Sequence, residues 1–69
     1  MSGTRFPIGV WGQVSGRTVI DRVRVEQSQP SGFLILTQEG GGTFDVWVET
    51  GADVAEFLEE LSIVWESPV

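Results

Sequence analysis

Apolar and polar residues alternate along much of the first fifty positions, and this period of two constrains the fold more than any other feature. The alternation runs from Ile8 to Val14 and again from Phe44 to Val48. It is typical of β-strands that bury one face. Residues 33–37 are apolar on both faces, which predicts a central strand. Turn-forming stretches separate these segments, as expected for an antiparallel meander.

Four strands are expected, at residues 6–14, 17–27, 32–38 and 43–50. A two-residue turn at residues 15–16 places Trp11 opposite Ile20 in the first hairpin. Asp21 then falls in the apolar row, so we predict a bulge near residues 20–22 that turns its carboxylate outward. The later connections are predicted as a polar loop and a flexible glycine-rich loop, at residues 28–32 and 39–42.

An amphipathic helix is predicted over about residues 52–61, from an apolar stripe formed by Val54, Phe57, Leu58 and Leu61. Thr50 or Asp53 can cap this helix, and Asp53 with Glu56 has the spacing of a capping box. Residues 63–66 are too apolar for a free tail and predict a short strand.

The predicted fold class is α+β: a four-stranded antiparallel meander with one C-terminal amphipathic helix packed on one face and a short final strand. A chain of 69 residues is expected to form a single small domain, 1–69. Such a small core, without disulfides or a metal, is stable only if it packs very regularly or gains stability from a partner, including another copy of itself.

The chain contains no cysteine, histidine or tyrosine, and its four basic residues are all arginine. This composition excludes disulfides, thiolate nucleophiles, Schiff-base lysines and imidazole metal ligands. Asp45 and Glu49 share a strand face with Trp47, and paired carboxylates also occur in glycosidase clefts. A chain this short leaves little room for a cleft, so we expect no enzyme, no cofactor and no metal site.

The formal charge of the chain is −6, and the charges are unevenly distributed. All four arginines precede Val25, whereas every acidic residue except Asp21 follows it. This balance argues against direct nucleic-acid binding, which requires phosphate neutralisation. Two interpretations stay open: a solvated surface, or a negative face that meets a basic partner.

No apolar run exceeds residues 33–36, whereas a membrane helix needs about 20 apolar residues. The N-terminus has no basic segment followed by an apolar stretch, as a signal peptide requires. We therefore expect a cytoplasmic protein without membrane contact.

Trp11 and Trp47 lie on the opposite parity from the main apolar row of their strands, and two arrangements are open. Either each tryptophan still lines the core, or these two form an apolar patch with Leu34 and Ile20 on the uncovered sheet face. Two arginines of that face are then expected to stack on the rings or to pair with its carboxylates: Arg22 and Arg24 with Asp45 and Glu49.

The leading hypothesis is a non-enzymatic acidic protein-binding module, such as a small inhibitor or immunity-type antitoxin that occludes a basic site on a partner protein, for example a nucleic-acid-binding site. An anti-defence protein that mimics nucleic-acid charge follows the same physics. The alternative is a small self-associating structural or regulatory subunit, a homodimer through the open sheet face or a sheet edge. The candidate partner-binding residues are two aromatic anchors and four carboxylates: Trp11, Trp47, Asp45, Glu49, Glu56 and Glu60.

Overall fold

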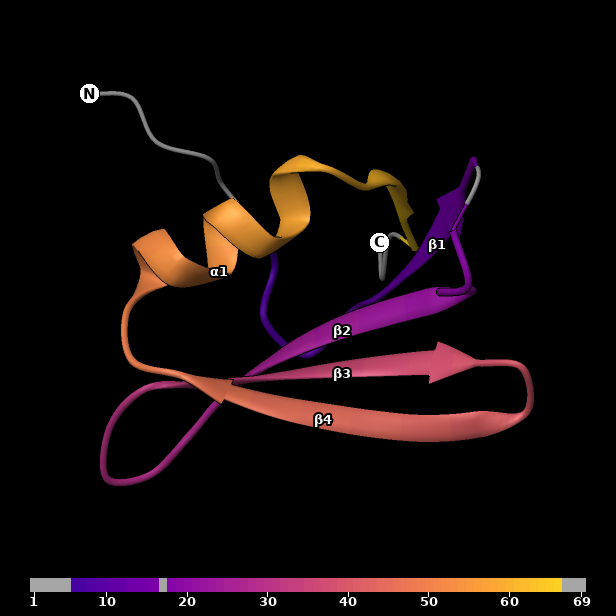
Figure 1. Cartoon of the computed structure of the whole chain (residues 1–69). Coiled ribbons are helices and arrows are strands. Elements are labelled where there is room, and N and C mark those ends of the chain that lie inside the picture. Colours follow the sequence, from indigo (N-terminus) through magenta and orange to yellow (C-terminus); the bar gives the residue numbers. More distant parts are fainter. Residues whose placement is uncertain (1–5, 17, 67–69) are drawn as a thin grey trace.

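Five β-strands and one α-helix form the computed structural model, which describes residues 6–16 and 18–66 (Figure 1). All strand pairs are antiparallel, so the predicted α+β class is confirmed. The elements follow the chain in the order β1 (Trp11–Ser15), β2 (Arg22–Gln27), β3 (Phe33–Glu39), β4 (Gly42–Val48), α1 (Gly51–Glu59) and β5 (Ser62–Trp65).

The sheet is a four-stranded meander widened by a fifth strand, in the spatial order β4-β3-β2-β1-β5. Helix α1 is not the C-terminal element beside a four-stranded sheet. It lies between β4 and β5 and carries the chain from one sheet edge to the other. There β5 pairs with β1, with Ile63 opposite Val14. The sequence indicated a last strand but not its partner.

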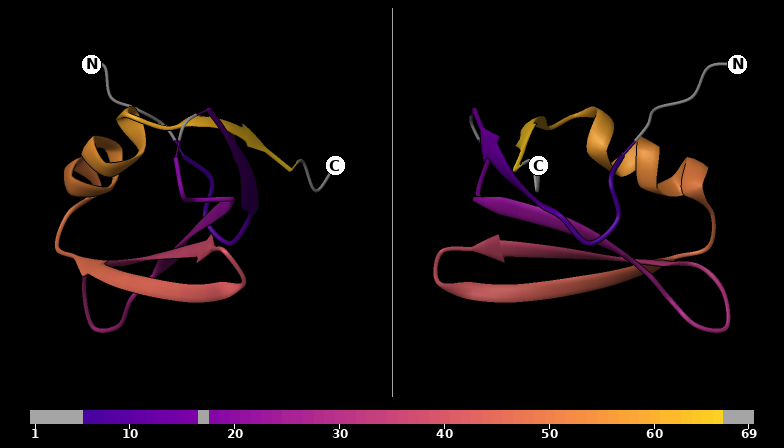
Figure 2. Two further views of the ribbon diagram at one scale, coloured as in Figure 1. Left: turned by 45° about the vertical axis from the view of Figure 1, so that its right-hand side comes forward. Right: turned by 180° about the vertical axis from the view of Figure 1, so that it is seen from behind.

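The sheet is strongly curled, and α1 lies across its concave face (Figure 2). β1 and β5 turn over the layer that β3 and β4 form, and the molecule measures 30 × 26 × 25 Å. Gly12 in β1 allows its neighbours to approach closely. A β-carbon at Gly12 would lie 2.5 Å from Cγ2 of Ile63 and 2.7 Å from the Trp65 ring.

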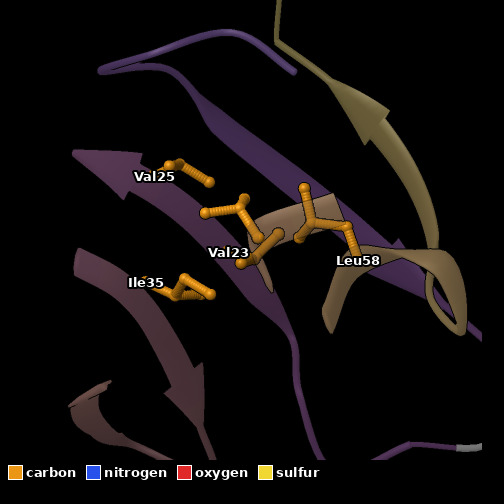
Figure 3. Close-up of a cluster of buried hydrophobic side chains, with 5 residues drawn as sticks. Val23, Val25, Ile35 and Leu58 are labelled. Carbon is orange, nitrogen blue, oxygen red and sulfur yellow. The ribbon is translucent and has the colours of Figure 1, made fainter. Parts of the chain in front are cut away.

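The hydrophobic core lies between α1 and the concave face (Figure 3). Its buried side chains are Val23, Val25, Ile35, Val54 and Leu58. The strand register explains part of this set, because Val25 lies opposite Ile35 on the same face. The predicted helical stripe is also confirmed, since Phe57 and Leu61 pack at the margin of this core.

The first hairpin differs from the prediction. β1 begins later than expected, and a longer connection replaces the two-residue turn. Trp11 lies opposite Arg24, four positions beyond the predicted partner Ile20. A slip of four residues preserves which face each side chain occupies, because the period of a strand is two. Asp21 keeps the parity of the apolar row but precedes β2, and the register of β2 is regular from its first residue onward, without the predicted bulge. Its exposed carboxylate accepts a hydrogen bond from the Gly40 amide at 3.3 Å.

Two further local predictions are corrected. Gly40 and Gly41 close the β3–β4 hairpin in two residues, with φ of +57° and +93°. Positive φ at both central positions is typical of a type I′ turn, so the predicted four-residue flexible loop is wrong. The capping box of α1 joins Thr50 and Asp53, not Asp53 and Glu56. The Thr50 hydroxyl accepts from the Asp53 amide at 3.1 Å, and the Thr50 amide donates to the Asp53 carboxylate at 3.2 Å.

Candidate functional site

Helix α1 covers only part of the concave face, because it is shorter than the strands beneath it. Its 9 residues span about 14 Å, whereas the 7 residues of β4 span about 23 Å. Phe44 and Val46 lie on the concave face of β4, and their cross-strand partners Thr37 and Ile35 are buried. Yet Phe44 is 56% exposed and Val46 is 47% exposed, because no element of the described chain covers them.

This incomplete cover opens a groove of about 550 Å³ between α1, the end of β4 and the β1–β2 connection. The residues that line the groove are Thr18, Ile20, Val48, Asp53, Glu56, Phe57, Glu60 and Leu61. Half of them are apolar and partly buried, so the groove offers hydrophobic surface that water still reaches.

A second hollow of about 520 Å³ continues from the groove toward the β3–β4 turn. It is lined by Thr18, Val19, Asp21, Glu39, Gly40 and Phe44. Thr18 lines both hollows, and Val19 is 73% exposed beside it. The open part of the concave face therefore extends along the whole length of β4.

The helical side of the groove is acidic. Glu56 and Glu60 are four residues apart and exposed, which places them one above the other on α1. Asp53 lies one turn before them and is engaged in the helix cap. Both arginines that the structure describes, Arg22 and Arg24, lie on the convex face of the sheet. The groove thus combines an apolar lining with carboxylates that form no ion pair with the arginines of residues 6–16 and 18–66.

Trp11 lies on the convex face, where the two arginines cover its ring. Cζ of Arg22 is 4.8 Å from the ring centroid, and Cζ of Arg24 is 5.8 Å away. The predicted stacking is confirmed. Trp11 is thus held by cation–π contacts within its own chain, and its ring face is not free for a partner.

The same arginines form ion pairs, but not the predicted ones. Nη2 of Arg22 lies 3.1 Å from Oε2 of Glu66, and Arg24 pairs with Glu26. Pairing with Asp45 and Glu49 is wrong, because Leu36 lies between Arg24 and Asp45 in the row that crosses the sheet.

Trp47 also lies on the convex face, near the end of the edge strand β4, and is 52% exposed. Its Nε1 donates a hydrogen bond to the Ser31 carbonyl oxygen at 3.1 Å. The indole packs over Gly32, where an added β-carbon would lie 2.5 Å from the ring. Trp47 is therefore fixed in orientation while half of its surface faces solvent. Trp65, by contrast, packs against the core.

The six predicted residues do not form one site. Trp11 and Trp47 lie on strands that are three sheet positions apart, which is about 14 Å. Of the neighbours predicted for them, Leu34 lies opposite Trp47 but Ile20 lines the groove instead. The structure groups Asp45 with Trp47 on the convex face of β4, groups Glu56 with Glu60 on the groove, and leaves Glu49 exposed beyond the end of β4.

The exposure of Phe44 and Val46 on the concave face was missed. Alternation assigned Phe44 and Val46 to the covered core row, because parity reports the face of a side chain and not what lies over that face. One signal was available: four stripe residues of a short helix cannot cover the concave rows of a five-stranded sheet. That signal depends on knowing that β5 joins the far edge.

No family model, curated protein or solved structure matches this chain. Across residues 6–16 and 18–66, no three potential metal-ligating side chains gather closely enough to hold an ion. In that same part of the chain, no helix has both the length and the hydrophobicity that crossing a membrane demands.

Proposed function

We propose that the protein is a non-enzymatic acidic protein-binding module whose groove receives a basic surface of a partner protein. The observation that carries this proposal is the combination of an apolar lining with the carboxylates of Glu56 and Glu60 in one open groove. Burial of the apolar lining supplies affinity, and the carboxylates supply partner choice and a fast approach.

Within this class, a small inhibitor or immunity-type antitoxin that occludes a basic, nucleic-acid-binding site fits best. The charge of −6 supports this, because it favours encounter with a positive surface. The positions of Arg22 and Arg24 support it too, since stacking and ion pairs keep both on the convex face. An anti-defence protein that blocks such a surface by charge mimicry belongs to the same physical class.

The alternative function, a self-associating subunit, is favoured by a different observation. Phe44, Val46 and Trp47 are large, exposed and apolar, and all three belong to a strand at the sheet edge. A homodimer through β4 would bury them. Its signature is a molecular mass that rises with concentration, whereas the binding module is a monomer until its basic partner is added.

The groove is tested by titration with a synthetic peptide of alternating lysine and valine, followed by calorimetry. The variant Glu56→Gln/Glu60→Gln is expected to weaken peptide binding about fivefold or more, because the groove loses the two carboxylates that attract the lysine side chains. Glu49→Gln/Glu59→Gln is the matched control, since it removes the same charge from exposed residues outside the groove. Equal losses in the two variants, or no binding by the native protein, would contradict the proposal.

A further inference from the structure

Strand β4 is a sheet edge without the usual protection. It pairs with β3 on one side only, and within the described chain nothing pairs with its other side. Natural edge strands are commonly kept short, or carry charges, proline or a bulge that prevent further pairing. β4 has 7 residues, no proline and one charged side chain, Asp45, and its register with β3 is regular throughout. It is therefore open to an added strand.

The hairpin register identifies which backbone groups are free. A two-residue turn makes Glu39 and Gly42 a hydrogen-bonded pair, and such pairs alternate along an antiparallel ladder. The amides and carbonyls of Thr43, Asp45 and Trp47 consequently point away from β3. No described backbone hydrogen bond outside the strand ladder reaches them. Three donors and three acceptors are thus available in one row.

The side chains of β4 are also exposed on both faces. Phe44 and Val46 face the open concave side, and Asp45 and Trp47 face the convex side. An added strand covers both sides at once, because its own side chains alternate between the same two faces. The free backbone groups of β4 and its exposed apolar side chains therefore lie on the same strand. A ligand in extended conformation is the kind of ligand that contacts both.

We propose that β4 binds an extended segment of the partner as a sixth, antiparallel strand. This inference rests on the proposed function, from which it takes the positive charge of the partner. The bound segment has up to about seven residues, the length of β4. Its side chains alternate: apolar ones lie beside Phe44 and Val46 on the concave face, and basic ones lie beside Asp45 on the convex face. The end of the segment beside Val48 borders the groove, where a further basic side chain meets Glu56 and Glu60.

The charge distribution favours this occupant over a second copy of the chain. Full antiparallel overlap of two β4 strands is centred on Asp45 and sets the two Asp45 carboxylates directly opposite each other. Like charges at facing positions destabilise a strand pair, and each copy also brings a charge of −6. A basic segment turns both repulsions into attractions.

The test uses the lysine–valine peptide with backbone methyl groups, which leave every side chain and charge in place. In the proposed register the lysine amides donate to β4 and the valine amides point to solvent. N-methylation of the lysine residues is therefore expected to abolish binding, whereas N-methylation of the valine residues leaves the affinity within about threefold. Equal effects of the two methylations would overturn strand addition.

Hydrogen exchange of the full chain gives the second readout. Saturation with the unmodified peptide is expected to slow exchange of the Thr43, Asp45 and Trp47 amides at least tenfold. Asp45→Pro removes the central donor of the edge, where proline is tolerated, and Asp45→Asn is its charge-matched control. The asparagine variant should bind and the proline variant should not.

The outcomes separate this inference from the function on which it rests. Peptide binding that depends on Glu56 and Glu60 but leaves the β4 amides unprotected would overturn strand addition alone. If these amides exchange more slowly as the protein concentration rises, before any peptide is added, the occupant of the β4 edge is a second copy of the chain. Equal binding of a glutamate–valine peptide would overturn both the basic occupant and the proposed function.

Discussion

Gly32 and Trp47 illustrate how one backbone position fixes one functional side chain. Gly32 has φ of +87° and lies directly beneath the Trp47 indole. A side chain at this position is disfavoured twice, by the backbone conformation and by the ring above it. The orientation of Trp47 at the edge of β4 therefore depends on the loop before β3.

Gly32→Ala is expected to destabilise the fold by about 2 kcal/mol or more and to release Trp47 from Ser31. Gly40→Ala is the matched control, because Gly40 also has positive φ but a β-carbon there meets no atom within 4 Å. Urea unfolding compares the two variants, and tryptophan fluorescence reports the indole. A Gly32→Ala variant no less stable than Gly40→Ala would show that Trp47 does not pack on this glycine.

At the scale of elements, the docking of α1 on the sheet depends on few side chains. Val54 and Leu58 are the two helical residues that are buried in the core. Leu58→Ala opens a cavity beneath the helix and is expected to cost about 2–5 kcal/mol of stability. Val64→Ala, at a site that is 71% exposed, should change stability by less than about 0.5 kcal/mol. Urea midpoints decide the matter, and a Leu58→Ala midpoint equal to that of the native protein would exclude Leu58 from the core.

The elements themselves were largely predictable from the sequence. Periodicity located four strands and the helix, and the Val54–Leu58 stripe identified the buried helical face. Register was not predictable, because a slip of four residues between β1 and β2 keeps every face unchanged. The partner of β5 was not predictable either, since pairing with β1 depends on where a crossing helix delivers the chain.

At the scale of the whole molecule, the acidic character was predictable but the site was not. Composition indicated a basic partner, and Glu56 and Glu60 do line a groove. Sequence grouped them with Trp11, which the fold places on the convex face under Arg22 and Arg24. Grouping residues into a site requires knowing how the sheet curls and where the helix ends, and both follow from tertiary packing.

In the proposed binding mode, the carboxylates and the Trp47 ring act at different stages of binding. The carboxylates act on the approaching partner over a Debye length, which is about 10 Å at 0.1 M salt. Charge reversal at Asp45 or Glu60 is therefore expected to slow association and to leave the fold intact. The ring of Trp47 acts only after contact, so Trp47→Ala is expected to speed dissociation instead.

The most direct measurement is the association rate of the lysine–valine peptide, by stopped flow, at low and high salt. If Glu56 and Glu60 of the groove attract a positive ligand, the association rate constant falls about tenfold or more between roughly 20 mM and 500 mM salt. The Glu56→Gln/Glu60→Gln variant then shows a clearly weaker salt dependence than Glu49→Gln/Glu59→Gln. An association rate that does not change with salt, or equal salt dependences in the two variants, would contradict recognition by the groove.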